Sequence, residues 1–386
     1  MYHTQNFTSP FCAGIFYCQI RTFNNRCLSI KFLKMKQISG LSILMLLLVI
    51  VLNGWKHKAI VRGKSPRIQV VVNSNGKRVD ITIEGKPFTS YIYPDVLKKP
   101  VLYPIRTAQG TLVTRGWPMD PRPGERVDHP HHVGMWFNYG DVNGFDFWNN
   151  SNDVGNNPGP FGTIVHEKVL QTKNGNKEGR LQVQASWQKP DGTSMLTEKT
   201  TFIFSGTAND RVIERLTTLT ATAQDVLFKD NKEGVLGIRL ARELEHPSNK
   251  PETFTDASGK ATAVPQLNNK NVTGMYTSSE GKTGDAVWGT RGKWVNLTGT
   301  IGNENISLVM LDHPGNVGYP TYWHARGYGL FAANTLGQSV LSSGKNTLNF
   351  LLTAGKSVTF KYRVNIHSGS YLTNTEVNNA FDAFAK

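Results

Sequence analysis

The fold class follows from residues 67–83, which read RIQVVV, then NSNG, then KRVDITI. The last run alternates apolar and polar residues, which is the pattern of a strand with one buried face. Between the runs, Asn75-Gly76 is the residue pair that tight hairpin turns favour. This stretch therefore predicts a β-hairpin at the start of the domain.

The same strand-like texture continues along the chain, with Gly, Asn, Asp and Pro between the segments. It covers residues 180–187, 194–204, 211–222, 305–310, 347–352 and 357–367. Helical character is confined to residues 374–386, which have an apolar face made by Val377, Ala380, Phe381 and Phe384. Many strands with little helix apart from a C-terminal one predict an all-β fold, a large antiparallel β-sandwich.

The formal charge of +15 is concentrated at the N-terminus. Residues 1–64 contain nine Lys or Arg and no Asp or Glu, which leaves 34 basic against 28 acidic residues in the remainder. That remainder has no dense basic run interleaved with aromatics, so we expect no nucleic-acid partner. All three cysteines precede residue 28, which excludes disulfides and thiol catalysis in the body of the protein.

An export signal is expected near the N-terminus. Residues 38–52 are almost wholly apolar and follow two lysines, as in a secretory signal. The run has about 15 residues, whereas a membrane span needs roughly 20. We expect a start-site extension (1–34), a signal peptide or N-terminal anchor (35–58), and a single large β-sandwich domain (66–386). The protein would be periplasmic or extracellular, with an uncleaved inner-membrane anchor as the alternative, and would meet a membrane only through this segment.

The loop at residues 128–132, Asp-His-Pro-His-His, concentrates candidate chemistry. Pro130 in the loop, with Pro123 and Gly124 before it, disfavours regular structure. Three interpretations of His129, His131 and His132 remain open. They can move protons at a sugar with help from Asp128, they can ligate a metal ion, or they can only hydrogen-bond loop carbonyls.

Residues 136–148 hold aromatic rings and carboxylates close to that loop. Trp136 and Trp148 suit the apolar face of a sugar ring, with a place in the core as the alternative. Asp141 and Asp146 are candidate ligand-binding carboxylates. For Asp141 the alternative is an Asx turn, in which the side chain binds its own backbone.

Residues 229–239 form a charged turn that runs into a strand. Glu233 is the most plausible carboxylate partner for the histidines. Lys229 and Arg239 would bind an anionic or hydroxylated ligand. The alternative is a solvated, charged hairpin.

A second Asp-His-Pro occurs at residues 312–314. The rigid loop after it displays polar and aromatic groups, as the wall of a binding site does. The candidate residues of this wall are Asp312, His313, Tyr322, Trp323, His324 and Arg326. We expect the two Asp-His-Pro loops and the 229–239 turn to converge on one pocket.

These motifs resemble the secreted bacterial family named methane oxygenase PmoA. The resemblance covers roughly residues 66–370 and includes Lys232-Glu233-Gly234 with Gly237-Ile238-Arg239. It implies a histidine-ligated copper oxidoreductase. The architecture is similar to the galactose-mutarotase-like supersandwich, whose members bind and process sugars.

The first functional hypothesis is an exported carbohydrate-processing enzyme of epimerase, lyase or hydrolase type. Its catalytic residues would be His129, His131, His132, Glu233, His313 and His324. One alternative is the metal oxidoreductase, with the ion held by His129, His131 and His132, and the other is a non-catalytic sugar-binding protein. We expect a carbohydrate ligand and no cofactor, with a Cu, Zn or Ca ion as the alternative.

Overall fold

The computed structural model describes residues 67–153, 159–264 and 268–386. All of them belong to the unit Lys64–Lys386, one of two into which the chain divides. The expected start-site extension and the signal or anchor segment lie outside the described residues. Within the described ranges, no helix is long and apolar enough to cross a membrane.

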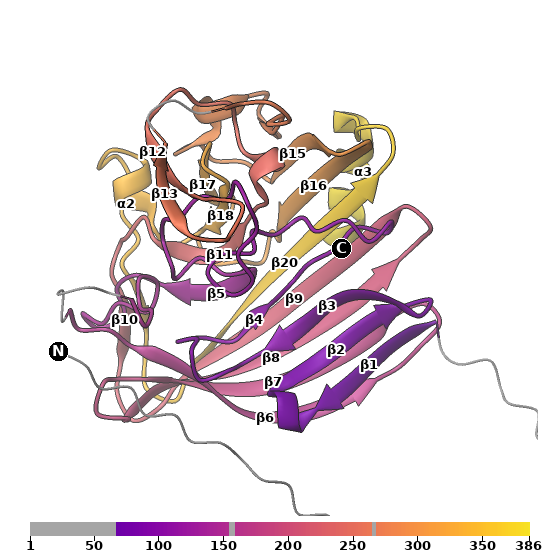
Figure 1. The fold of residues 1–386 in the computed structure, drawn as a ribbon. Coiled ribbons are helices and arrows are strands. Elements are labelled where there is room, and N and C mark those ends of the chain that lie inside the picture. The colour runs from indigo at the N-terminus through magenta and orange to yellow at the C-terminus, as the bar shows by residue number, and fades with distance from the viewer. Residues whose placement is uncertain (1–66, 154–158, 265–267) are drawn as a thin grey trace, which may run out of the picture. The chain divides into compact units, whose positions relative to one another are not determined.

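Two eight-stranded antiparallel sheets form this unit (Figure 1). The first sheet has the order β1 (Ile68–Asn73), β2 (Arg78–Ile83), β3 (Lys86–Ile92), β4 (Val101–Leu102), β5 (Met135–Tyr139), β11 (Gly234–Arg239), β18 (Leu330–Asn334) and β17 (Tyr322–Arg326). The second has the order β14 (Met275–Ser278), β15 (Trp294–Ile301), β16 (Glu304–Asp312), β20 (Ser357–Ser368), β9 (Asp210–Ala221), β8 (Ser194–Gly206), β7 (Gly179–Gln188) and β6 (Thr163–Lys173).

The remaining elements are short. Two further two-stranded antiparallel sheets are β10 (Val226–Phe228) with β19 (Phe350–Leu352) and β12 (Glu252–Thr255) with β13 (Ala261–Val264). The helices are the 3-10 turns η1 (Ser74–Gly76), η2 (Arg242–Leu244) and η3 (Gly284–Val287), and the α-helices α2 (Gln338–Leu341) and α3 (Asn374–Phe384).

The hairpin predicted from residues 67–83 is confirmed. Strands β1 and β2 pair from Ile68 opposite Ile83 to Asn73 opposite Arg78. The turn between them is the 3-10 turn η1, and Lys77 closes it with a left-handed φ of 46°.

The sandwich core lies between the two sheets because alternate side chains of each strand point inward. Phe88 of β3 meets Phe204 of β8 with ring centres 6.2 Å apart. Phe137 of β5 meets Phe360 of β20 at 5.7 Å. These contacts join the two sheets, so the large antiparallel β-sandwich predicted from the sequence is confirmed.

The C-terminal helix predicted over residues 374–386 is α3. It opens with a capping box in which Thr373 and Glu376 bind each other's backbone N–H, which satisfies donors that a helix start leaves free. Its apolar side chains pack on the outer face of the second sheet. The residues in this contact are Trp294, Val309, Leu311, Val377, Phe381 and Phe384.

The strand predicted over residues 347–352 is shorter than expected. Only Phe350–Leu352 pairs as β19. The Asp230 carboxylate accepts hydrogen bonds from the backbone of Leu348, at 2.7 Å, and of Asn349, at 3.3 Å. These bonds occupy donors that a strand partner would otherwise use.

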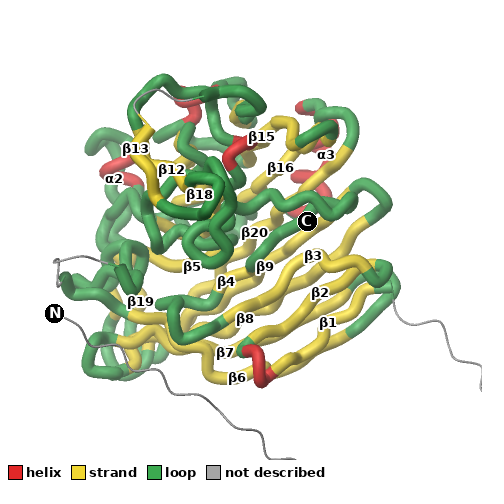
Figure 2. Tube along the Cα trace, in the orientation of Figure 1, coloured by secondary structure: helices red, strands yellow, loops and turns green. Residues whose placement is uncertain are grey.

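Loops gather over the part of the first sheet that contains β5 and β18, whereas the region of β1–β3 and β6–β8 is mostly strand (Figure 2). On β5, Phe137 points into the sandwich and its neighbour Trp136 points to the outer face. The loops that cover this outer face include most of the candidate site residues.

Candidate functional site

The 128–132 loop is a tight turn that enters β5. His129 has a left-handed φ of 46°, and the His132 N–H donates to its carbonyl at 2.9 Å. Gly134 follows with φ 58°, and a Cβ there would lie 2.2 Å from the Leu102 carbonyl oxygen. Only glycine therefore allows the loop to approach β4 this closely.

The Asp128 carboxylate is the centre of this loop. Arg115 and Arg239 each donate to its Oδ1 at 2.5 Å, and the His129 ring contacts its Oδ2 through Nδ1 at 2.8 Å. Burial alone would raise the pKa of Asp128, but the charge of Arg239, the His129 hydrogen bond and the charge of Arg115 hold it well below its usual value. Asp128 is therefore an ionised anchor for two buried arginines.

Arg115, which the sequence reasoning missed, also fixes the loop backbone. Its guanidinium donates to the carbonyls of Asp128, His129 and His132 at 2.9, 3.0 and 3.2 Å. No sequence motif marks this role, because Arg115 is separated from the loop by a turn and acts only through folding.

Four rings stack in a column over the outer face of the first sheet. The order is Tyr328, His129, His132 and Trp136, with ring centres 5.1, 4.8 and 5.0 Å apart and planes within 16° of parallel. Trp148 meets both His132 and Trp136 edge-on. The predicted residues of this region do come together, and the column holds two of the three loop histidines rigidly.

His132 is fixed as a neutral ring. Its Nδ1 lies 3.2 Å from Nη1 of Arg239, and because arginine can only donate, this nitrogen accepts and the proton sits on Nε2. Burial and the nearby positive charges hold the pKa of His132 well below its usual value. His132 therefore does not supply a proton at neutral pH as an imidazolium would.

His131 turns out of the column and lines a pocket. Burial, followed by the charge of Lys99, lowers the pKa of His131 to about 2, so the ring is neutral at pH 7. Its Nε2 is buried and has no hydrogen-bond partner among the described residues. A ligand in the pocket would find a neutral hydrogen-bonding ring there.

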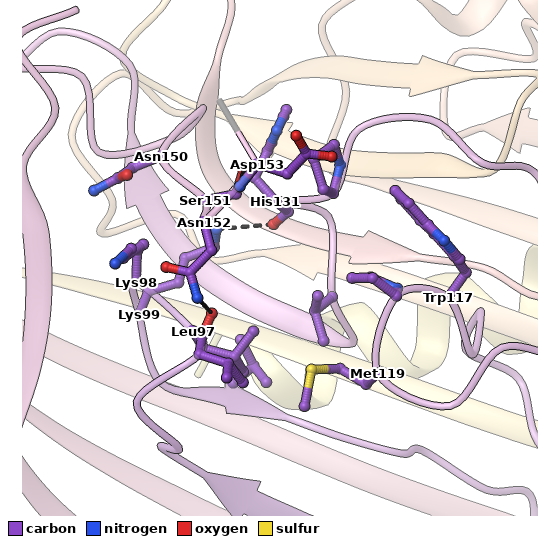
Figure 3. Close-up of a pocket in the computed structure, with 15 residues that line it drawn as sticks. Leu97, Lys98, Lys99, Trp117, Met119, His131, Asn150, Ser151, Asn152 and Asp153 are labelled. Atoms are coloured by element: carbon purple, nitrogen blue, oxygen red, sulfur yellow. Dashed lines mark hydrogen bonds between the residues drawn. The ribbon is translucent and has the colours of Figure 1, made fainter. Parts of the chain in front are cut away.

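The pocket has a volume of about 350 Å³, within the range of small-molecule sites. Four segments form its walls, namely 96–101, 117–119, 130–133 and 150–153. Trp117 and Met119 stand across it from Leu97 and Asn152 (Figure 3). The sequence reasoning missed the 117–119 wall because a single tryptophan in a proline-rich loop has no distinguishing pattern.

Lys99 is the buried one of three charged residues that line this pocket, the others being Lys98 and Asp153 (Figure 3). The Lys99 side chain is almost completely buried, with 4% of the residue exposed. Nζ donates to the His131 carbonyl at 2.8 Å and lies 5.7 Å from the centre of the Trp136 ring. No carboxylate of the described residues lies within 4.0 Å of it. Burial lowers the pKa of Lys99 to about 7, against a smaller opposing effect of Asp146.

Glu233, which immediately precedes β11, and His324 of β17 form a second cluster. Their closest N–O distance is 3.9 Å, and His324 Nδ1 also contacts the Lys232 carbonyl at 2.9 Å. Burial lowers the pKa of His324 to about 4. The charge of Glu233 is also one cause of the raised pKa of Asp146, after burial, so this cluster lies within electrostatic range of the 128–148 region.

Several other predicted residues have structural roles. Asp141 accepts from the Gly144 N–H at 2.9 Å, which is the Asx-turn alternative, and Asp146 accepts from the N–H of Trp148 at 2.8 Å. Lys229 is exposed. Two more predicted residues, Tyr322 and Trp323, lie on β17. Trp323 is in the core, and the Tyr322 ring lies under the Arg291 guanidinium.

Arg326, also on β17, faces a different surface. Its guanidinium lies 5.3 Å from the Trp288 ring centre and 6.0 Å from that of Tyr328. It is therefore next to the outermost ring of the column and not in the pocket that Lys99 lines.

The second Asp-His-Pro does not face the first. Asp312 ends β16 in the second sheet and is buried, where it accepts from Asn316 at 2.7 Å and from the Thr321 N–H at 2.8 Å. Burial raises its pKa to about 7. His313 meets Phe384 of α3 edge-on. In the described part of the chain, it makes no hydrogen bond, ion pair or ring contact to the 128–132 loop, because the two loops leave different sheets.

The loop histidines do not fit a shared metal ion. His129 and His132 stack with planes 2° apart, so their ring lone pairs run parallel and do not meet at one point about 2 Å from both nitrogens. Each also uses its Nδ1 for a charged side chain. Across the described ranges, no group of three His, Cys, Asp or Glu is placed to hold a metal.

The chain belongs to DUF6807, a family of unknown function, whose model matches residues 78–382. This finding overturns the resemblance to the methane oxygenase PmoA family, for which no family model matches. No curated protein matches the sequence.

Solved structures similar to this chain include carbohydrate-active enzymes. The galactosidase domain of an alpha-galactosidase-sucrose kinase is 9% identical with a TM-score of 0.36, covering 78% of this chain and 42% of that one. A GH36 alpha-galactosidase from Geobacillus stearothermophilus is 9% identical with a TM-score of 0.34, covering 79% and 41%. Galactose 1-epimerase from Lactobacillus acidophilus NCFM is 9% identical with a TM-score of 0.32, covering 79% and 100%. The chain thus spans about two fifths of the first two proteins.

Proposed function

We propose that this member of DUF6807 is a carbohydrate-processing enzyme of epimerase, lyase or hydrolase type, with Lys99 as its proton-transfer group. The observation that supports this most is a buried lysine, with no carboxylate partner among the described residues, in the lining of a pocket that also contains Trp117. A buried charge is normally paired, so an unpaired one beside a ligand-sized cavity is expected to have a chemical role.

Lys99 is suited to acid–base catalysis near neutral pH. A pKa of about 7 means that the amine and ammonium forms are present in similar amounts. A catalytic group is most efficient when its pKa is close to the working pH. Of the loop histidines that the sequence favoured, His131 and His132 are less suitable, because burial lowers the pKa of each ring and so makes it a weak base. We propose that His131 positions the substrate by hydrogen bonding while Lys99 takes and returns the proton.

The lining of the pocket suits a sugar. An indole ring packs against the apolar C–H face of a sugar, as the ring of Trp117 can do here. Side-chain amide oxygens accept from hydroxyl groups, and Asn150 and Asn152 lie on the opposite wall with amide nitrogens that already donate within the protein. The Asp128 network holds the loop that carries His131, so this side of the pocket is pre-organised.

A turnover screen tests the proposal. The purified protein is incubated in D₂O with a panel of neutral and acidic mono- and oligosaccharides, and products and deuterium incorporation are followed by NMR. We expect at least one saccharide to be converted. Lys99→Met should lower kcat about 100-fold or more, the usual contribution of a general acid or base. Lys99→Arg should be equally impaired, since arginine keeps its proton.

The control is Lys356→Met, at an exposed turn far along the chain, which should keep full activity. Full activity of Lys99→Met would overturn the role of Lys99. Binding of a saccharide without turnover would replace the enzyme proposal by the sugar-binding alternative. Failure to bind or convert any saccharide would overturn the substrate class.

We also propose that the protein is exported, on the basis of the apolar run at residues 38–52 and the basic residues before it. Fractionation of cells that express the full chain should find it outside the cytoplasm. Deletion of residues 35–58 should retain it in the cytoplasm, and an unchanged distribution would contradict the proposal.

A further inference from the structure

A second, larger groove adjoins the Lys99 pocket. It has a volume of about 650 Å³ and is lined by residues of the β1–β2 turn, the 93–100 segment and β6. Leu97, Lys98 and Lys99 line both cavities. The segment 97–99 therefore forms their common wall, and a ligand chain that crosses it would occupy both.

This common wall is held in place from both sides. The Lys98 carbonyl accepts from the Ile164 N–H of β6 at 2.9 Å. On the other side, the Asn152 side chain donates to the Val96 carbonyl at 3.1 Å. The two cavities therefore keep a defined relation to each other.

The groove contains a rigid aromatic platform. The Tyr93 ring stacks on His166 with centres 3.9 Å apart and planes 29° from parallel. His166 is fixed by a 3.1 Å contact between its Nδ1 and the Tyr91 hydroxyl. Burial lowers the pKa of His166 to about 4, so the His166 ring is uncharged at neutral pH. Such a surface suits the apolar face of a further sugar unit.

The charge around this platform is positive. Four lysines line the groove against two carboxylates, and these are Lys77, Lys98, Lys99, Lys168, Asp95 and Glu167. Lys77 is paired with Asp95, and Glu167 accepts a hydrogen bond from Gln184. Lys98 and Lys168 form no ion pair within the part of the chain that the structure describes. With Lys77 balanced by Asp95, Lys98 and Lys168 remain against the single carboxylate of Glu167, so the groove keeps an excess of positive charge.

Strand β6 is shaped around the groove. It is the edge strand of the second sheet, and its pairing with β7 shifts register between His166 and Lys168. The extra residue is Glu167, so this is a β-bulge, a feature that re-aims side chains next to binding sites.

We propose that the groove is a subsite for the continuation of an acidic oligosaccharide, whose processed end occupies the Lys99 pocket. This inference rests on the proposed function and adds its substrate class, a sugar chain with anionic groups along it. Those groups are carboxylates in a polyuronate and sulfate esters in a sulfated glycan, and both would meet Lys98 and Lys168 while one sugar ring packs on Tyr93.

Calorimetry on the full chain tests the proposed subsite by measuring the binding of oligosaccharides of defined length. The series are galacturonic acid oligomers, sulfated carrageenan oligomers and neutral cello-oligomers, each of two, four and six units. In at least one acidic series, Kd should fall about tenfold or more from dimer to hexamer, as one additional ring contact and one or two cation contacts would give. The neutral series should gain less than about threefold.

Matched variants show which residues produce the gain in affinity with oligosaccharide length. Lys168→Gln and Tyr93→Ala should each remove most of the gain with length and leave dimer binding unchanged. Tyr93→Phe keeps the ring and should retain the gain, and Lys173→Gln, on the exposed end of β6 outside the groove, should behave as the wild type. Thermal unfolding of each variant confirms that it is folded.

Equal gains for neutral and acidic series, or no gain with length, would overturn the subsite while turnover of short sugars leaves the proposed function intact. The uronate and sulfate series identify which anion is preferred. If no saccharide of any length binds, the proposed function and this inference both fail.

Discussion

Replacing Lys99 with methionine should make the protein more stable at neutral pH, and the gain should shrink as the pH rises. The side chain is 4% exposed, and burial lowers its pKa from 10.5 to about 7. At about 1.4 kcal/mol per pKa unit, protonated Lys99 costs the fold on the order of 5 kcal/mol.

The pH window follows from which state holds the proton. Below pH 7, Lys99 is protonated in both the folded and the unfolded chain, so the full cost applies. Between pH 7 and 10.5 the unfolded chain keeps a proton that the folded chain lacks, so the stability of the wild type rises with pH. Above 10.5 the cost is gone. Methionine does not titrate, so the Lys99→Met variant lacks this contribution to the pH dependence of stability.

Two losses oppose the gain. The His131 carbonyl loses its donor, which costs about 1–2 kcal/mol, and the contact with the Trp136 ring loses about 0.5–1 kcal/mol. Methionine is unbranched and flexible, so it fills the space of the lysine stem. The net expectation is a variant about 2 kcal/mol more stable at pH 6.

Urea unfolding of the wild type and Lys99→Met at several pH values between 6 and 9.5 measures this. The difference between their free energies of unfolding should fall by about 3 kcal/mol from pH 7 to 9.5, with Lys356→Met as the control for losing an exposed lysine. A difference that stays constant over this range would show that Lys99 keeps its ordinary pKa, and the reasoning would be refuted.

Four further outcomes are expected. If the Lys99 amine is the base, kcat/KM should rise tenfold per pH unit below about pH 7 and level off above it; a profile that falls through pH 7 would make Lys99 the acid instead. Asp128→Asn removes the charge that two buried arginines share, and urea unfolding should show a loss of about 3 kcal/mol, whereas a loss under about 1 kcal/mol would contradict the network. Trp117→Ala should raise the Kd of a bound saccharide about tenfold in calorimetry through loss of ring contact, with unchanged affinity as the contrary result. Gly134→Ala places a Cβ against the Leu102 carbonyl at φ 58° and should lower the free energy of unfolding by about 2 kcal/mol, so a variant of native stability would refute this.

Much of the fold could be predicted because strand patterns are local. Alternation in residues 78–83 reports directly that one face of β2 is buried, and the same reasoning located α3 at the C-terminus. Strand β19 was predicted too long, since a side chain from residue 230 binds its first backbone groups. That contact joins residues more than 100 positions apart, which no local pattern records.

The candidate site was predicted only in part. The sequence placed three histidines in one loop, and that loop does meet Trp136 and Arg239. The expectation that both Asp-His-Pro loops converge on one pocket was wrong, because His313 packs against α3. Identical local sequences say nothing about which sheet a loop leaves, so this error could not be corrected without the structure.

By itself, the sequence determined the β-sandwich, the loop that holds the histidines and the apolar segment expected to direct export, because these depend on residue type and short-range pattern. Only the tertiary structure decided that Lys99, Arg115 and Trp117 belong with that loop and that His313 does not. It also decided the protonation of the site, since a pKa depends on burial and on charges brought together from distant parts of the chain. The proposed proton-transfer role therefore falls not on the histidines that the sequence displays but on Lys99, whose pKa is lowered by burial in the folded protein.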